Sequence, residues 1–128
     1  MALIIDLKPS EKIIVGNSVI TNDTHRARLH IEGDAPILRE RDIMTESDAN
    51  TPCKRIYLAI QLMYLSPDPE TLHKTYFDMV QEVQKAAPST GLFFLKINDH
   101  ILNNHYYKAL KECNNLIEHE EEILANAQ

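Results

Sequence analysis

The sequence lacks the features expected of a membrane or secreted protein. Its 128 residues include only 3 glycines, 2 cysteines and no tryptophan. No apolar run approaches the ~20 residues that cross a bilayer, and no basic stretch precedes an apolar core near the N-terminus. We therefore expect a cytoplasmic protein with no membrane partner. Cys53 and Cys113 fit buried free thiols in a reducing compartment, with one buried disulfide as the alternative.

Groups of residues suited to catalysis or metal binding are also missing. Gly16, Gly33 and Gly91 are scattered, so they form no glycine-rich phosphate loop, and no nucleophile stands beside a base in a known arrangement. The six histidines show no ligand spacing typical of a metal site. We expect no catalytic residue, metal or cofactor, and hence a binding protein instead of an enzyme.

Charge is distributed unevenly along the chain. The net charge is −6, of which residues 45–128 carry −5 and residues 1–44 carry −1. A protein that is acidic overall repels nucleic acid, so any site that binds a polyanion must be a local patch of positive charge. The acidic second half should repel nucleic acid, and no DNA partner is expected.

Hydrophobic periodicity divides the chain into a β-rich part and a helical part. The pattern predicts an α+β fold, with a small antiparallel β-module at residues 1–44 and a bundle of about four helices at 45–128. A capped turn is expected at residues 45–48, and Thr51 and Pro52 form a typical helix start. Strands are predicted at residues 3–7, 12–16, 18–21, 26–31 and 35–38, and helices at about 52–65, 70–87, 91–102 and 106–124.

Residues 1–44 contain four of the five arginines and no aromatic residue. Alternation over residues 26–31 places Arg26, Arg28 and His30 on one face of a strand. Guanidinium groups can hold phosphates and read base edges, whereas base stacking on aromatic rings is not expected here. The alternative, favoured by composition alone, is a set of solvated charges paired with Glu32, Glu40 and Asp42. The candidate RNA-binding residues are Lys8, Arg26, Arg28, Arg39 and Arg41.

The predicted helix at 52–65 is apolar on nearly every side, which is typical of burial in a core or a subunit interface. This helix and the acidic second half favour a protein-binding function. Glutamates 120–122 near the end of the last helix are expected to be solvated. The candidate partner-interface residues are Ile56, Leu58, Leu62 and Leu65.

The N-terminal residues resemble the carbon storage regulator family, CsrA. The similarity lies in Lys8-x-x-Glu11, in Ile14-Val15-Gly16, and in Arg28-Leu29-x-Ile31 followed by Ala35-Pro36. CsrA proteins are small β-rich dimers with interlocked strands that bind messenger leaders. The resemblance implies that Arg39 or Arg41 is the RNA-contacting arginine at the end of the last strand, with Arg39 favoured. It also implies that Arg28 and Lys8 contact phosphates, and it allows a homodimer.

The whole chain also resembles the flagellum biosynthesis repressor family, FlbT. The similarity is carried by residues 35–40, 42–46, 49–52, 54–57 and 59–64, and by 106–111 in the last helix. It implies post-transcriptional repression, in which the protein binds the 5′ untranslated leader of flagellin messenger RNA and promotes its degradation or blocks its translation. The alternative is a chaperone-like adaptor for flagellin or a second flagellar regulator, with indirect effects on RNA.

Overall fold

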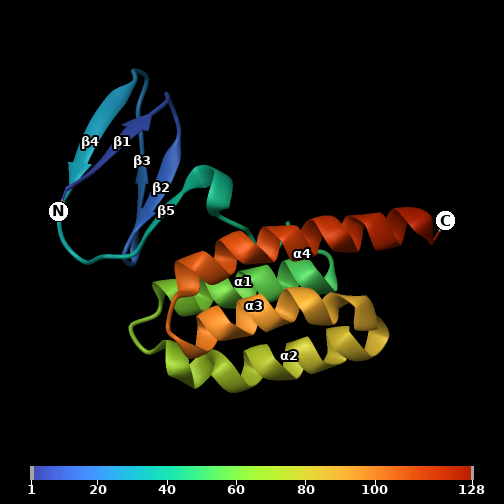
Figure 1. The fold of residues 1–128 in the computed structure, drawn as a ribbon. Helices are drawn as coiled ribbons and strands as arrows, with labels where there is room; N and C mark the ends of the chain where they lie inside the picture. Colours follow the sequence, from blue (N-terminus) through green and yellow to red (C-terminus); the bar gives the residue numbers. More distant parts are fainter. Residues whose placement is uncertain (1, 128) are drawn as a thin grey trace. The chain divides into compact units, whose positions relative to one another are not determined.

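The computed structural model describes residues 2–127, and its α+β fold agrees with the prediction (Figure 1). The chain divides between Ile43 and Met44 into two compact units. We call residues 2–43 the β-unit and residues 44–127 the helical unit. Met44 belongs with the helices because the Gln61 side chain accepts a hydrogen bond from its backbone N–H (2.8 Å) and donates one to its carbonyl (3.0 Å).

The β-unit contains two small antiparallel sheets. β1 pairs with β4 in one sheet, and β2 pairs with both β3 and β5 in the other. Apolar side chains from both sheets form a core around Ile5, Leu7 and Ile13. The elements are β1 (Leu3–Leu7), β2 (Lys12–Val15), β3 (Ser18–Thr21), β4 (Ala27–Ile31), β5 (Ile37–Arg39) and the 3₁₀ helix η1 (Glu40–Asp42).

Two tight turns set the register of these strands. Gly16 adopts a φ of +63° in the predicted hairpin turn between β2 and β3, a conformation that glycine adopts at little cost. In the turn after β1, the Glu11 carboxylate accepts a hydrogen bond from the Lys8 backbone N–H at 2.8 Å. Ser10 in that turn has a φ of +65°, which is uncommon for a residue with a side chain. The turn therefore holds Lys8 beside the end of β1.

The helical unit contains the four predicted helices. Thr51 caps the first by accepting a hydrogen bond from the Lys54 N–H, and Pro52 is its first residue, as predicted. Residues 45–48 form only a turn, in which the Thr45 hydroxyl accepts a hydrogen bond from the Asp48 N–H. The elements are α1 (Pro52–Leu65), η2 (Pro69–Leu72), α2 (His73–Ala86), η3 (Pro88–Thr90), α3 (Gly91–Leu102) and α4 (Tyr106–Asn126).

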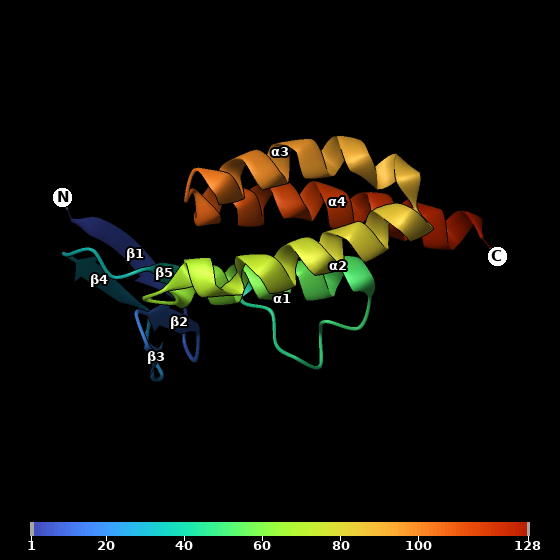
Figure 2. The same ribbon diagram turned by 90° about the horizontal axis from the view of Figure 1, so that it is seen from below.

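The four helices form a bundle (Figure 2), in which α4 packs against both α1 and α3, and α1 packs against α2. Fully buried side chains form the core between the helices, among them Ile60, Tyr76 and Phe94. Tyr76 on α2 donates a hydrogen bond of 2.7 Å to Asn98 on α3, which links these two helices as well. No helix among the described residues is long and apolar enough to cross a membrane.

Candidate nucleic-acid interface

A polar hollow of about 550 Å³ in the β-unit is lined by three of the five candidate RNA-binding residues. Lys8 reaches it from the turn after β1, Arg39 from the end of β5, and Arg41 from η1. Lys8 is about thirty positions away from Arg39 and Arg41 in the sequence, so only the fold brings it to them. The full lining is Asp6, Lys8, Pro9, Ser10, Glu11, Arg39, Glu40 and Arg41.

The other two candidate residues, Arg26 and Arg28, interact electrostatically with Asp6, which lines the hollow. Asp6 and Arg28 are direct neighbours on β1 and β4, and their Oδ1 and Nε atoms lie 2.9 Å apart. The hydrogen bond and charge of Arg28, followed by the charges of Arg26 and Arg39, hold the pKa of the Asp6 carboxyl below its usual value. Arg26, Arg28 and Arg39 therefore all act electrostatically on one carboxylate. We call Lys8, Arg26, Arg28, Arg39 and Arg41 the basic patch.

Two of the three carboxylates that line the hollow accept hydrogen bonds from backbone N–H groups. Glu11 accepts a hydrogen bond from the Lys8 backbone, and Glu40 accepts one of 3.1 Å from the Lys12 backbone. Among residues 2–127, the side chains of Lys8 and Arg41 form no ion pair. The pairing that we considered with Glu32, Glu40 and Asp42 is thus not found for Arg28, whose partner is Asp6. The side chains of Lys8 and Arg41 can therefore contact a phosphate, whereas that of Arg28 is engaged by Asp6.

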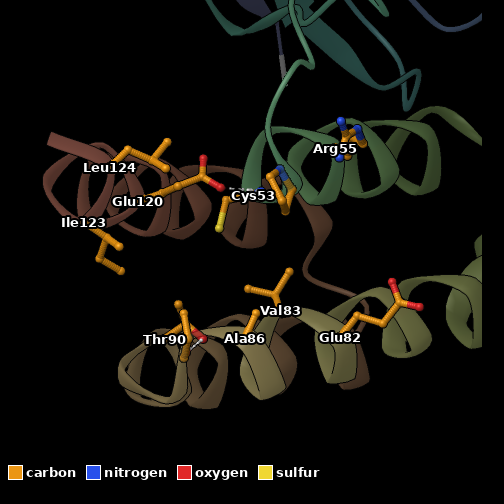
Figure 3. Close-up of a pocket in the computed structure, with 11 residues that line it drawn as sticks. Cys53, Arg55, Glu82, Val83, Ala86, Thr90, Glu120, Ile123 and Leu124 are labelled. Atoms are coloured by element: carbon orange, nitrogen blue, oxygen red, sulfur yellow. Dashed lines mark hydrogen bonds between the residues drawn. The ribbon is translucent and has the colours of Figure 1, made fainter. Parts of the chain in front are cut away.

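The helical unit has a separate, mainly apolar hollow of about 380 Å³ between the start of α1 and the ends of α2 and α4 (Figure 3). Val83 and Ala86 on α2 line it opposite Ile123 on α4, and Leu124 on α4 is also part of the lining. Polar groups are few, and the complete lining is Pro52, Cys53, Arg55, Glu82, Val83, Ala86, Ala87, Thr90, Glu120, Ile123 and Leu124. A cavity of this kind suits an apolar side chain of a partner.

Glu120 forms part of the wall of this hollow and corrects one expectation from the sequence. Its side chain is buried, with 8% of its surface exposed, instead of lying in solvent. Its carboxylate accepts hydrogen bonds from the Thr51 hydroxyl and, at 2.9 Å, from the Cys53 backbone N–H (Figure 3). A carboxylate at the N-terminus of a helix is favoured by the helix dipole and by unpaired N–H groups. Sequence reasoning missed this because the two helix ends are far apart along the chain.

The candidate partner-interface residues on α1 do not share one surface. Leu62 is 54% exposed, but Ile56 is fully buried in the core of the helical unit. Leu58 and Leu65 are half-buried. Ile56 is therefore corrected from a partner contact to a core residue, because the apolar character of α1 on that side is used for packing inside its own unit.

Cys53 and Cys113 are both buried and both free, as expected for reduced thiols. Burial raises the pKa of the Cys53 thiol to about 12, and the neighbouring Glu120 carboxylate adds to this shift. Burial likewise raises the pKa of Cys113. Residues 2–127 contain no group of three or more histidine, cysteine or acidic side chains that could hold a metal ion.

Comparisons with known proteins agree along almost the whole chain. The family model described as flagellar protein FlbT matches residues 3–124. A probable flagellum biosynthesis repressor protein FlbT 1 of Bradyrhizobium diazoefficiens is 56% identical over 124 residues, covering 96% of this chain and 85% of the relative. The Rhodopseudomonas palustris relative with the same description, FlbT, is 47% identical over 98% of this chain and 99% of its own length.

A more distant relative is the flagellum biosynthesis repressor protein FlbT of Caulobacter vibrioides. It is 31% identical over 129 aligned positions, which cover 98% of this chain and 92% of the relative. No solved structure matches this chain.

Proposed function

Because the chain belongs to the FlbT family of flagellar proteins, we propose that it represses flagellum biosynthesis by binding the 5′ untranslated leader of flagellin messenger RNA. The RNA would bind to the basic patch of the β-unit. Bound protein would block translation or expose the message to degradation, and it would act without catalysis in the cytoplasm. The relatives named as flagellum biosynthesis repressors support the repressor part of this proposal.

The observation that carries the RNA-binding part is the convergence of Lys8, Arg39 and Arg41 on one polar hollow. Such a group of cations offers several phosphate contacts on a protein that is acidic overall, and the planar guanidinium groups can also form paired hydrogen bonds to base edges. Since the β-unit has no aromatic residue, recognition would depend on charge and hydrogen bonds instead of stacking.

A direct titration tests this proposal. Purified full-length protein is titrated against a flagellin-leader RNA and a scrambled RNA at two salt concentrations. We expect selective binding that weakens as salt rises, because each phosphate contact on single-stranded RNA contributes a slope of about −0.7 in log affinity against log salt. Equal binding to both RNAs, or no binding, would contradict the proposal.

A pair of charge-matched variants locates the site. Arg39→Ala/Arg41→Ala removes two cations from the basic patch, and Lys85→Ala/Lys108→Ala removes two exposed cations from the helical unit. We expect the first variant to lose leader affinity and to show a shallower salt slope, with the second close to wild type. Equal losses would mean that net charge alone drives the association.

A second candidate function is supported by the apolar hollow at the ends of α1, α2 and α4. In this alternative the helical unit is an adaptor that binds flagellin or a second flagellar regulator. Its negative charge and the carboxylates of Glu82 and Glu120 favour a partner segment with an apolar side chain flanked by basic residues. Such a partner would bind regardless of RNA.

Calorimetric titration with purified flagellin tests the adaptor function. Ala86→Arg places a long side chain at the hollow, whereas Gln81→Arg adds the same charge to α2 outside its lining. If flagellin is the partner, the first variant should lose binding and the second should keep it. Absence of binding by the wild-type protein would remove flagellin as the occupant.

A further inference from the structure

The outward face of α3 carries the most exposed large apolar side chains of the described chain. We call Leu92, Leu95 and Leu102 the leucine stripe, and these residues are 75%, 70% and 66% exposed. The opposite face of the same helix is fully buried in the helical unit through Phe94, Ile97 and Ile101. The leucine stripe is therefore not needed to pack α3 into its own unit, because a different face of the helix does this.

The spacing of the stripe is that of a helix-packing surface. The three leucines are separated by three and seven positions, which correspond to positions a, d and the next d of a heptad repeat, and they lie within about 80° of one another around the helix. Single exposed apolar residues are common on protein surfaces, but an aligned group of them marks an interaction site. Asp99 lies within the stripe and Lys96 at its border.

We propose that the leucine stripe pairs with the same stripe of a second copy of this chain, with the two α3 helices antiparallel. A two-fold axis near Ile97 would place Leu92 of each copy opposite Leu102 of the other. The same arrangement places Leu95 of each copy opposite Asp99 of the other, and it brings Lys96 at the border of the stripe within one position of that carboxylate, so that each Asp99 has a cation of the other copy beside it. The face thus pairs apolar with apolar side chains at Leu92 and Leu102 and pairs opposite charges near the axis, as a self-complementary two-fold interface requires.

The charged groups on α3 are free enough to form these contacts. The Lys96 side chain is 73% exposed, and its nearest carboxylate partner, Glu112 on α4, lies at 4.0 Å, the limit of an ion pair. Asp99 is exposed and accepts a hydrogen bond from Asn103 one turn later on the same helix. Neither side chain is held in the interior of the unit.

The size of the stripe indicates a weak and reversible dimer. α3 has 12 residues and is therefore about 18 Å long. A standard protein interface buries about 800 Å² on each partner, which is more than three leucines and their neighbours supply. We therefore expect association in the micromolar range. This inference does not depend on the proposed RNA-binding function.

Cysteine cross-linking tests the antiparallel pairing directly in the full-length protein. Antiparallel pairing separates Leu92 from its own counterpart by about 15 Å along the axis, too far for a disulfide. Leu92→Cys/Leu102→Cys should therefore give a disulfide-linked dimer with a mild oxidant, and neither single variant should do so. Efficient cross-linking of the single variants, or none in the double variant, would overturn the proposal.

Charge reversal provides an independent test by sedimentation at several protein concentrations. Lys96→Glu alone should weaken the dimer more than tenfold, because it places a second carboxylate next to Asp99 of the other copy on both sides of the two-fold axis. Lys96→Glu/Asp99→Lys should restore the dimer by reversing the pair. Leu95→Glu should abolish association, whereas Val19→Glu, at an exposed site on β3, should not. A dimer affected only by Val19→Glu, or a protein that stays monomeric at all concentrations, would refute pairing through α3.

Discussion

Asp6 on β1 and Arg28 on β4 face each other directly, and their Oδ1 and Nε atoms are 2.9 Å apart. Both side chains are more than half exposed, so the pair contributes little to the stability of the β-unit. Its consequence is electrostatic. The Asp6 carboxylate engages the guanidinium group that a phosphate would otherwise bind, and it places a negative charge beside the basic patch.

The first prediction concerns this competition. Asp6→Asn should strengthen binding to the leader RNA by about twofold to fivefold, because it removes a negative charge and releases Arg28, and an exposed ion pair is only a weak competitor. Fluorescence anisotropy with labelled RNA measures the change. Asp34→Asn, at an exposed site outside the hollow, should have a smaller effect. Weaker binding by Asp6→Asn would contradict this account.

The second prediction concerns pH. Because the pKa of Asp6 is lowered in the folded protein, the ion pair is fully formed above the unfolded value of about 3.9 and is lost only as pH falls through the lower folded value. The pair should therefore persist from pH 5 to pH 8. Titration of the Asp6 carboxyl carbon by NMR measures this directly. Arg28→Ala should move the midpoint back towards the usual value, and an unchanged midpoint would argue against the pairing.

The third prediction separates the two candidate strand-end arginines. Arg39→Ala should weaken leader binding by about 1–3 kcal/mol if Arg39 reads a base, whereas loss of a phosphate contact should weaken binding to all sequences alike. Arg41→Ala, measured in parallel, shows which of the two has the larger role. Arg55→Ala in the helical unit is the matched control. Unchanged affinity in Arg39→Ala would remove that residue from the site.

The fourth prediction concerns the buried carboxylate at the start of α1. Glu120→Gln should destabilise the helical unit by about 1–3 kcal/mol, because it removes a charge from the helix N-terminus and leaves a buried donor without a good acceptor. Urea unfolding measures the loss. Glu121→Gln changes an exposed neighbour on the same helix and should have almost no effect. Equal effects of the two variants would mean that Glu120 does not cap α1.

The fifth prediction concerns the thiols. With a pKa of about 12, Cys53 is almost entirely protonated at pH 8, and Cys113 has no exposed surface. Iodoacetamide should therefore modify neither residue rapidly in the folded protein, and both should react in urea, since the thiolate is the nucleophile. Mass spectrometry of tryptic peptides reads out each site. Rapid modification of Cys53 at pH 8 would show that the start of α1 opens readily.

The sequence predicted local structure well where the signals were local. The turn chemistry of Gly16 and the cap at Thr51 and Pro52 gave element boundaries that the structure reproduces closely. Alternation in β4 also identified Arg28 as an outward-facing residue. These signals depend on neighbours in the chain, which is why they could be read without the fold.

Features that depend on long-range pairing could not be predicted in the same way. The partner of Arg28 is determined by the register of β1 on β4, which brings Asp6 opposite it. The burial of Glu120 depends on packing of α4 against α1. The sequence of α1 likewise does not distinguish Ile56, which is buried, from Leu62, which is exposed, because the helix is apolar on nearly all sides.

The link between Glu120 and the start of α1 also bears on the order in which the protein forms during synthesis. The residues joined by this link, Thr51 and Glu120, are 69 positions apart. At about 5–20 residues per second, a ribosome needs roughly 3 to 14 s between them. During that interval the β-unit is already translated, while α1 lacks its capping carboxylate and its packing partner α4. The nascent chain can thus have a folded N-terminal part while its helical part is still incomplete.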